Sequence, residues 1–554
     1  MKQAKFNLRE VAVFSTLLIL THVFYYPTWN AGFVTDFTGL ADRIEGSNVW
    51  GIFNSFGFPA LQQVLNFFLY LFYKGFGVSP LPWYLVFTTM HVLNAWCLYR
   101  FSRHLLSLYQ IKNTAFISIA GALFFLLLPY QSEVLTWRVC FNFLLCSLLI
   151  INSLWSISRW LETKENRFLW RSHLFFGLAL FTFELSFSLP LIAGAYLLFW
   201  TFSQGERPLL SQRLLKLTVP HFLMVGAYFL LSRLVIGAWI GHYGASTHLR
   251  FSFPEITGNL FRYFVKTGFF VRYLEHPTKE MIFSFFDNQW ALYVLLIILG
   301  SFLVEALIRF RKLSAKGQLT LFFLLSFFIA LLPIINLYFN YLLFIENDRY
   351  GYLASMFFCV FLALVLSGLP KWWRYGLSLV FIFFCTLTLT KTNRFWKEST
   401  TVYRGLLNSF DYYDQGKVYL LNLPDNLMGA VLFRDFSGSD AAFEHALRFV
   451  KRKPFQGNIR EVVQYNLTRP TNGVKVEQDS TNRLEVSFLQ YGNWWWRRGQ
   501  GAGSYENEDY KFMNQGDHYL LELKNPEENA IFLYQIENRW EQFTPDRSNW
   551  TNRQ

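Results

Sequence analysis

Charged residues and cysteines are both scarce in this chain of 554 residues. Asp, Glu, Lys and Arg make up only 16% of it, whereas soluble domains carry about 25%. With 53% hydrophobic and 20% aromatic residues, this composition excludes a disordered chain, a fibrous repeat and an ordinary soluble enzyme. The five cysteines all lie in apolar runs, so we expect buried thiols and no disulfide framework. A metal-binding signature of the His/Cys type is also missing.

The apolar residues occur in runs that are long enough to cross a bilayer. A span takes about 20 residues, and the runs predict a polytopic membrane protein with about eleven transmembrane helices. The predicted spans are roughly 11–27, 82–100, 114–128, 139–157, 173–184, 186–202, 216–235, 289–308, 318–338, 350–368 and 374–391.

Lys and Arg predict the orientation of these spans, because cytoplasmic loops are enriched in both. With a cytoplasmic N-terminus, all the basic segments lie on the cytoplasmic side, so the net charge of +13 is no evidence for nucleic acid. This holds only if the apolar stretch 59–76 does not cross. Since polar residues recur along it, we predict an amphipathic helix in the outer interface. The basic segments are Lys2–Arg9, Arg100–Lys112, Arg159–Arg171, Arg207–Lys216, Arg309–Lys316 and Lys371–Arg374.

The composition changes after about residue 392. Residues 393–554 have no long apolar run, and short alternating segments between 484 and 537 indicate β-strands. Residues 417–450 are typical of a strand, a turn and a helix. We therefore predict a mainly α protein, in which residues 1–392 form the membrane domain and 393–554 form a soluble α+β domain on the outer face. This organisation suits a bacterial inner membrane with a periplasmic C-terminal domain, and a eukaryotic secretory membrane stays open.

Ionisable side chains gather near the outer ends of the predicted spans. Each one alone has an ordinary explanation, such as a solvated Asp, a His that bonds a helix carbonyl, or an Arg that anchors at headgroups. A charge within a span costs on the order of 2.5–3.5 kcal/mol, however, so such residues are candidates for function. Together they indicate a site for a lipid phosphate, because Arg binds phosphate oxygens in pairs and carboxylates act as bases or metal ligands. The residues are Asp36, Asp42, His91, Glu133, Arg138, Glu184, Glu346, Asp348 and Arg349.

Two weaker motifs lie in the C-terminal part. Gly499–Gly503 is glycine-rich like a phosphate loop, but no helix pattern follows it, and a β-hairpin loop is the better interpretation. The run Trp494–Arg498 is compatible with stacking on a sugar, with contact to the membrane interface, or with core packing. Asn466 and Asn549 begin glycosylation sequons, which matter only in a eukaryotic secretory lumen.

Several stretches within residues 10–370 resemble the GT-C class of integral membrane glycosyltransferases. The likeness is strongest to the transmembrane O-mannosyltransferases that carry C-terminal tetratricopeptide repeats. FVTDFTGL is similar to that family's first-loop segment, with Asp36 in the first Asp position and Phe37 in place of the second. LPYQSEVLTWR matches at Pro129, Glu133 and Trp137.

Three further stretches extend this resemblance. The segment from 58 to 99 matches at Gly75, Pro80 and His91, and FTFELSFSLP retains Glu184. ENDRYGYLAS matches at Asp348, Arg349, Tyr352 and Ser355. The C-terminal part shows no tetratricopeptide pattern, so the acceptor does not carry over from the family.

The resemblance implies a transferase that moves a sugar from a polyprenyl phosphate to a hydroxyl acceptor on the outer face, with inversion. Asp36 would be the base, with Asp42 as the runner-up. Glu133 and Glu184 are further catalytic candidates, and Asp348 and Tyr352 are secondary ones. The phosphate would be bound by Arg349, Arg138 and His91. Glu133, Glu184 and Asp348 would orient the arginines or hold a divalent cation.

The implied partners are the polyprenyl-phosphate sugar donor, membrane lipid, and an acceptor that is a protein, a lipid or a glycan. Two other classes of function stay open. A flippase or polymerase of lipid-linked saccharides is one, although a flippase needs charges along the whole pathway, and this chain gathers them at one face. A membrane scaffold without enzymatic activity is the other, although a scaffold has no need for several carboxylates at one depth.

Overall fold

The structure, a computed structural model, describes most of the chain and divides it into two compact units. The helical unit comprises Met1–Tyr26, Ser47–Leu135 and Cys140–Lys391, and the mixed unit comprises Pro27–Gly46, Thr136–Val139 and Thr392–Gln554. The described residues are 8–54, 60–204, 210–239, 253–270, 273–274, 278, 281–282, 284–285, 288–335, 348–412, 416–434, 442–452, 458–480, 482–489, 495–497, 500–501, 503–524 and 529–546.

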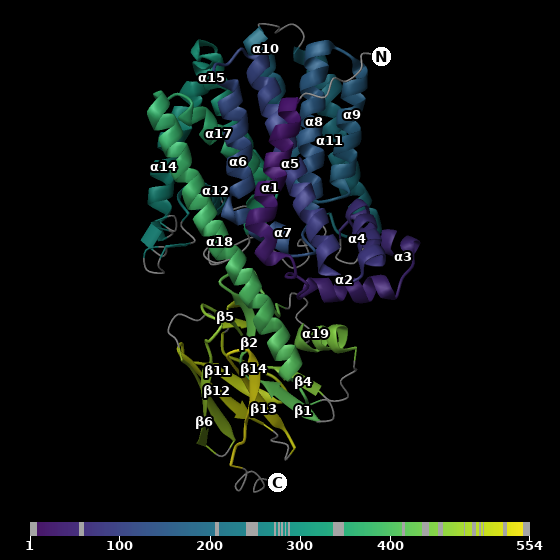
Figure 1. Ribbon diagram of the computed structural model, residues 1–554, viewed down its shortest axis with the longest axis vertical. Helices are drawn as coiled ribbons and strands as arrows, with labels where there is room; N and C mark the ends of the chain where they lie inside the picture. The colour runs from purple at the N-terminus through teal and green to yellow at the C-terminus, as the bar shows by residue number, and fades with distance from the viewer. Residues whose placement is uncertain are drawn as a thin grey trace. The chain divides into compact units, whose positions relative to one another are not determined.

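Long helices that run side by side make up most of the helical unit (Figure 1). The helices are α1 (Leu8–Tyr25), α3 (Val49–Phe53), α4 (Gln63–Phe76), α5 (Pro80–Leu108), α6 (Thr114–Leu127), α7 (Ser132–Thr136), α8 (Phe141–Thr163), α9 (Asn166–Leu180), α10 (Leu189–Gln204), α11 (Leu210–Ile236), α12 (Phe253–Phe269), α14 (Gln289–Ile308), α15 (Ala315–Leu331), α17 (Tyr352–Leu366) and α18 (Lys371–Ser409). Short 3-10 helices join them, including η2 (Pro129–Gln131), η3 (Glu184–Ser188), η7 (Phe310–Lys312) and η8 (Asp348–Gly351).

Every stretch predicted as a span is largely helical, but the count of eleven spans stays a prediction. In the described part of the chain, 6 helices are long and apolar enough to cross a membrane, and 7 if α6 and the helical turns after it form one bent span. α6 ends where Leu128 takes an extended conformation, because a residue before proline disfavours the helical region. The helix pair is bent there by 52°.

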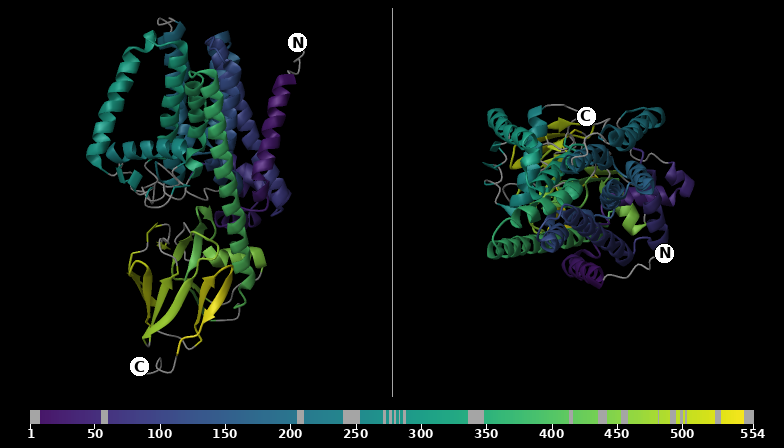
Figure 2. Two further views of the ribbon diagram at one scale, coloured as in Figure 1. Left: turned by 60° about the vertical axis from the view of Figure 1, so that its left-hand side comes forward. Right: turned by 90° about the horizontal axis from the view of Figure 1, so that it is seen from above.

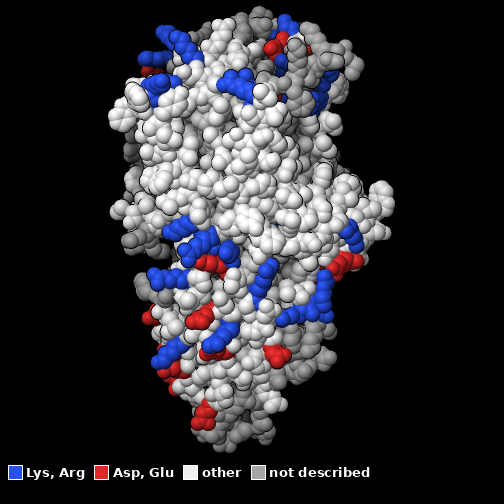
Figure 3. All heavy atoms as spheres, viewed as in Figure 1, with Lys and Arg blue, Asp and Glu red and all other residues white. Residues whose placement is uncertain are grey.

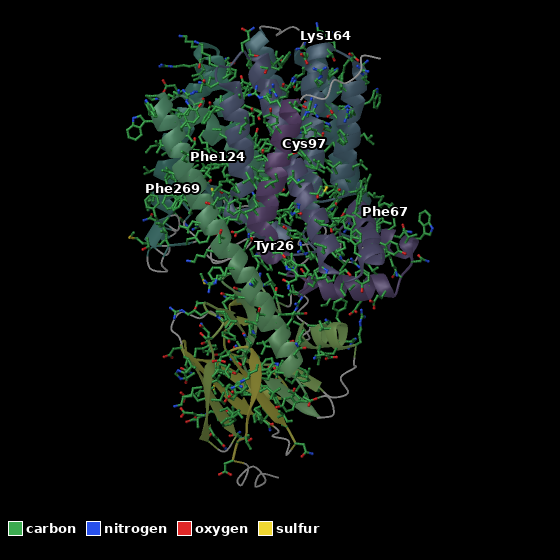
Figure 4. The ribbon with its side chains drawn as sticks, viewed as in Figure 1. Tyr26, Phe67, Cys97, Phe124, Lys164 and Phe269 are labelled. Carbon is green, nitrogen blue, oxygen red and sulfur yellow. The ribbon has the colours of Figure 1, made fainter. Side chains whose placement is uncertain are left out.

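The basic segments of the helical unit gather at one of its ends. Arg100 lies 3.9 Å from Glu10, and His104 lies 3.8 Å from Glu162. Lys164 and Tyr26 lie at opposite ends of the unit in Figure 4. Figure 3 shows Lys and Arg at the end that holds Lys164, next to a belt without charged side chains on the face in view. The sequence predicted that the basic segments lie on one side of the membrane domain. Which end faces the cytoplasm stays a prediction.

The stretch predicted to lie in the interface forms α4, which does not cross the unit. Its 14 residues span about 21 Å, less than the ~30 Å of a bilayer core. Val64 N donates to Phe181 O at the start of α4, and the end of α4 leads directly into the start of α5. Both points lie at the end opposite Lys164. Leu69 is buried while Phe67 is exposed (Figure 4), so α4 is amphipathic as predicted.

Three β-sheets form most of the mixed unit. The strand orders are β14-β13-β1-β4, β10-β11-β12-β7-β6 and β3-β2-β5-β8-β9. The strands are β1 (Lys417–Leu420), β2 (Leu423–Leu427), β3 (Ala430–Val431), β4 (Asn458–Glu461), β5 (Gln464–Leu467), β6 (Val474–Ser480), β7 (Arg483–Phe488), β8 (Trp495–Arg497), β9 (Gln500–Gly501), β10 (Tyr505–Glu506), β11 (Tyr510–Asn514), β12 (His518–Leu523), β13 (Ile531–Ile536) and β14 (Arg539–Phe543).

The predicted strands of the C-terminal part are confirmed. The alternating segments form β7, β12 and β13, and the helix predicted after β1 and β2 is α19 (Ala442–Lys451). The glycine-rich segment pairs as a hairpin, with Trp496 opposite Gly501, as we predicted. A core that includes Tyr419, Phe512 and Phe532 lies between two of the sheets. The five cysteines are free and buried, also as predicted.

Residues of the first loop pack within the mixed unit. α2 (Asp36–Glu45) lies against α19, where the rings of Phe37 and Phe449 are 6.1 Å apart. Arg452 bonds Glu45 at 3.0 Å. The mixed unit therefore includes more than the residues after 392, and the predicted functional division at that residue stays a prediction. Asn466 is 3% exposed and bonded to Asn426, so its sequon is closed in the folded protein.

Candidate functional site

Glu133 and Arg349 form a buried ion pair in the helical unit. Glu133 lies in α7, directly after the bend that follows α6, and Arg349 lies in η8, before α17. One carboxylate oxygen of Glu133 accepts from the backbone N–H of Arg349 at 2.8 Å, and the other accepts from its guanidinium. Arg349 also donates to the Tyr350 hydroxyl at 2.8 Å. Glu133 therefore fixes Arg349 through both its main chain and its side chain.

A second ion pair adjoins the first. Lys266 Nζ lies 2.7 Å from Asp348 Oδ1, and the two side chains are 4% and 1% exposed. Asp348 precedes Arg349 in η8, and the Tyr130 hydroxyl donates to Lys266 O at 2.6 Å. Removing an ion from water costs several kcal/mol, and apolar residues fill such space at least as stably. Four buried charges at one place therefore indicate a function.

Lys266 belongs to α12, which lies between the predicted spans 216–235 and 289–308. Figure 2 shows α12 lying crosswise at one end of the helical unit. It contributes Arg262, Tyr263 and Lys266, all nearly fully buried. The sequence reasoning missed these residues because it searched for charges at span ends. The spacing of Asn259, Arg262 and Lys266 on one helix face is the signal that could have found them.

His91 and Tyr352 are brought together on α5 and α17. Both are fully buried. His91 Nδ1 lies 2.8 Å from the Tyr352 hydroxyl, and Nε2 lies 3.2 Å from Leu126 O. Because a carbonyl only accepts, Nε2 carries the proton and Nδ1 accepts from Tyr352. This favours the ordinary explanation for a histidine in a span, and the phosphate-binding role of His91 stays a prediction.

Glu184 has a different set of neighbours. It begins η3 and accepts from Gln62 Nε2 at 3.5 Å, next to the start of α4. Phe143 lies between this region and the ion pairs, with ring contacts to Phe183 and Tyr350. The catalytic role of Glu184 therefore stays a prediction.

Asp36 lies in the first turn of α2, in the mixed unit, next to a strained residue. Thr35 has φ 45° and ψ −115°, a conformation that a β-branched residue rarely adopts. Its hydroxyl donates to Arg434 O. Strain of this kind costs about 1–3 kcal/mol and concentrates at functional positions. The observation supports a role for Asp36, whose assignment as the base stays a prediction.

Arg138 anchors the first loop by its hydrogen bonds within the mixed unit. Its guanidinium donates to Thr28 O and Trp29 O, each at 3.2 Å, and its backbone N–H donates to Gly32 O. Gly32 has φ +87°, and a Cβ there would lie 1.7 Å from Thr136 O. Only glycine fits this close approach. The phosphate-binding role predicted for Arg138 stays a prediction.

Asp42 is an exposed residue of α2, on the helix that packs against α19. Partial burial raises the pKa of Asp42 above its usual value. The charge of His445 opposes this rise, Glu45 adds to it, and Arg448 and Arg452 oppose it. The arginines and histidine around Asp42 give it a structural environment within the mixed unit.

The carboxylates of the ion pairs do not fit a divalent cation. Both oxygens of Glu133 accept from Arg349, and Asp348 is paired with Lys266. Over the part of the chain that the structure describes, no three His, Cys, Asp or Glu side chains form a metal-binding group. The metal role suggested for Glu133 and Asp348 therefore receives no support, and Glu346 lies outside the described residues.

Comparisons with known proteins give a distant likeness in fold. No protein-family model matches the chain, and no curated protein matches it. It is similar to an archaeal oligosaccharyltransferase, AglB from Archaeoglobus fulgidus, in complex with an inhibitory peptide and a dolichol-phosphate. That match has 11% identity and a TM-score of 0.42, over 81% of this chain and 64% of that one. A structure of the Archaeoglobus fulgidus oligosaccharyltransferase with Zn and sulfate gives 11% identity and a TM-score of 0.40, over 81% and 62%. This chain thus spans less than two thirds of either protein, and no residue role follows from such a likeness.

Proposed function

We propose that the protein is a membrane glycosyltransferase that moves a sugar from a polyprenyl phosphate to a hydroxyl acceptor. One observation carries this proposal: the ion pairs of Arg349 with Glu133 and of Lys266 with Asp348 lie side by side, buried at one end of the helical unit. A planar guanidinium binds two phosphate oxygens at once. A guanidinium held in place by a carboxylate needs little reorganisation when negative charge develops beside it.

The chemistry needs a base and fixed positive charge. The base removes the proton from the acceptor hydroxyl, the oxygen bonds to the anomeric carbon from the far side, and the bond from that carbon to the phosphate oxygen breaks. The configuration inverts, and the leaving polyprenyl phosphate carries away the electron pair. A phosphate leaves without a general acid, so Arg349 and Lys266 would stabilise the charge that develops on it.

Asp36 is the proposed base. It is the first-loop acid that matches the family's motif, and the strained backbone at Thr35 precedes it. Asp42 is the weaker candidate, because its surroundings on α19 explain it structurally. Glu133 would position Arg349, a role that its hydrogen bonds support.

Transport and scaffolding fit the buried charges less well. Among the described residues of the helical unit, the buried Asp, Glu, Lys and Arg side chains are Glu133, Arg213, Arg262, Lys266, Asp348 and Arg349. All but Arg213 lie on α7, α12 or η8. A pathway for a charged headgroup needs polar groups along its length. A polymerase of lipid-linked saccharides would share the donor chemistry and would differ in its acceptor.

Mass spectrometry of a strain that lacks the protein tests the proposal. The strain should accumulate a sugar-bearing polyprenyl phosphate and lose one glycan product. Wild-type protein and Arg309→Lys should restore the product, since Arg309 is exposed and paired with Glu305, whereas Arg349→Lys should not. Unchanged lipid-linked sugars and glycans in the strain would contradict the proposal.

A further inference from the structure

We infer that α12 supplies part of the donor site, with the Tyr263 hydroxyl and the Lys266 ammonium as ligands of the donor's phosphate group. This inference rests on the proposed function and adds two residues from outside the stretches that resemble a known family. It assigns a recognition role to a segment that lies between two predicted spans.

α12 is amphipathic, but it buries its polar face and exposes its apolar face. Its buried side chains are polar, while its apolar side chains, such as Phe261, Val265 and Phe269, are more exposed; Phe269 points outward in Figure 4. A helix at a membrane surface gains no stability by burying charged side chains against the protein, because each charge must be desolvated. The polar face therefore needs a reason beyond stability. Its members are Thr257, Asn259, Arg262, Tyr263, Lys266 and Thr267.

Tyr263 provides the observation that points to a ligand. It is 2% exposed, and its ring packs 4.0 Å from the position a Cβ of Gly351 would take. Arg349 lies two residues before Gly351 in the same 3-10 helix, η8. Among the described residues, its hydroxyl has no hydrogen-bond partner. A buried hydroxyl without a hydrogen-bond partner is unfavourable. A phosphate oxygen beside Arg349 would accept its hydrogen bond.

Lys266 adds charge of the right sign. Its ammonium has three N–H donors, and Asp348 lies 2.7 Å away. Arg262 lies one turn earlier on the same buried face and donates to Asn259 Oδ1 at 2.9 Å. Arg262, Lys266 and Arg349 outnumber Glu133 and Asp348 by one positive charge, three against two. This excess matches the single negative charge of a phosphodiester between a sugar and a polyprenyl chain.

Binding of a short prenyl phosphate to the purified full chain tests the inference. Citronellyl phosphate is titrated by calorimetry against wild type, Tyr263→Phe and Lys266→Met in detergent. A hydrogen bond to a charged group typically changes affinity by about tenfold or more, so Tyr263→Phe should weaken binding about tenfold. Its melting temperature should stay the same or rise, because the lost hydroxyl has no partner among the described residues. Lys266→Met should weaken binding further, and Lys266→Arg should restore part of it.

Two control variants separate binding from folding. Tyr196→Phe removes a buried hydroxyl that donates to Ser158 at 2.9 Å. It should lower the melting temperature and leave affinity unchanged. Lys74→Met removes an exposed cation on α4 and should change neither quantity. If Lys266→Met does not fold, Tyr263→Phe decides the question.

The outcomes separate this inference from the proposed function. If wild type binds citronellyl phosphate, Arg349→Lys weakens binding and the α12 variants do not, the inference is wrong and the function stands. If wild type binds no prenyl phosphate, the proposed function fails. Inorganic phosphate and nanodiscs of phosphatidylglycerol serve as further probes. Loss of inorganic phosphate binding in Tyr263→Phe would support the contact, whereas binding of phosphatidylglycerol alone, unaffected by the variants, would overturn it.

Discussion

At the scale of single residues, ion pairing distinguishes the candidate side chains from one another. Arg349 is held by Glu133, and Asp348 is paired with Lys266, so both carboxylates are already engaged by side-chain cations. His91 is engaged at both ring nitrogens. Under the proposed function, Arg349 and Lys266 would bind the phosphate, and the base would be another residue.

Asp36 and Asp42 are separated by a pair of substitutions. Removing a base typically costs about 100- to 1,000-fold in rate, so Asp36→Asn should nearly abolish sugar transfer while expression and donor binding persist. Asp42→Asn should cost little. Transfer assays with both variants check this. A dead Asp42→Asn beside a normal Asp36→Asn would reverse the assignment of the base and leave the fold untouched.

The raised pKa of Asp42 predicts how stability depends on pH. In the folded protein this carboxyl binds its proton more tightly than in the unfolded chain. Wild type therefore loses stability as the pH rises from the ordinary Asp value, near 3.9, through the higher folded value. At neutral pH, Asp42→Asn should have a free energy of unfolding higher than that of wild type by about 0.5 kcal/mol or less, and a slightly higher melting temperature. Both differences should vanish below the ordinary pKa of Asp. A variant that melts lower at neutral pH would show that Asp42 stabilises the fold as an ion.

Sequence reasoning found part of the site and missed part, for physical reasons. Glu133, Asp348 and Arg349 stand out because charges beside long apolar runs are costly. Lys266 and Tyr263 were missed because polar residues between two predicted spans are expected to be solvated, whereas α12 buries them. The packing of Phe37 on Phe449 joins residues far apart in the chain, and local periodicity cannot reveal such a contact.

At the scale of elements, helix length and proline placement fix the course of the chain. α6 stops before Pro129, and the turns after it carry Glu133 to η8. α4 is too short to cross, and α12 lies crosswise with its polar face buried (Figure 2). The apolar run of α4 led to its prediction from sequence, whereas α12 was missed although its polar side chains recur on one helix face.

The position of α4 predicts a labelling pattern. Asn54 follows α3, and Lys74 lies near the end of α4, and both are exposed. Cysteines at the two positions should react with an impermeant reagent from the same side, the outer one, because α4 does not cross. The native cysteines are buried, which keeps the background low. Labelling from opposite sides would show that the stretch spans the membrane and would invert the later loops.

At the scale of the whole molecule, the chain combines a unit of apolar helices and a mixed unit with three β-sheets. The break in composition near residue 392 predicted the β-rich part. It could not predict that residues 27–46 pack there, since their contacts are made to residues far away in the chain, such as Phe449 and Arg434. Basic segments gather at one end of the helical unit, and which end faces the cytoplasm stays a prediction.

A reporter fusion tests that orientation. A phosphatase joined to the C-terminus should be active, because six basic segments predict that the mixed unit lies on the outer side. A cytoplasmic reporter at the same point should be silent. The opposite pattern would overturn the predicted topology.

Cleavage of defined donors by the purified protein tests the central claim most directly. The full chain in lipid nanodiscs is given synthetic polyprenyl-phosphate sugars and a membrane extract as acceptor, and released polyprenyl phosphate is measured. Wild type and Arg309→Lys should release it at similar rates, and Arg349→Lys should be slower by about 100- to 1,000-fold. Equal rates for Arg349→Lys and Arg309→Lys, or no release from any donor, would contradict the account.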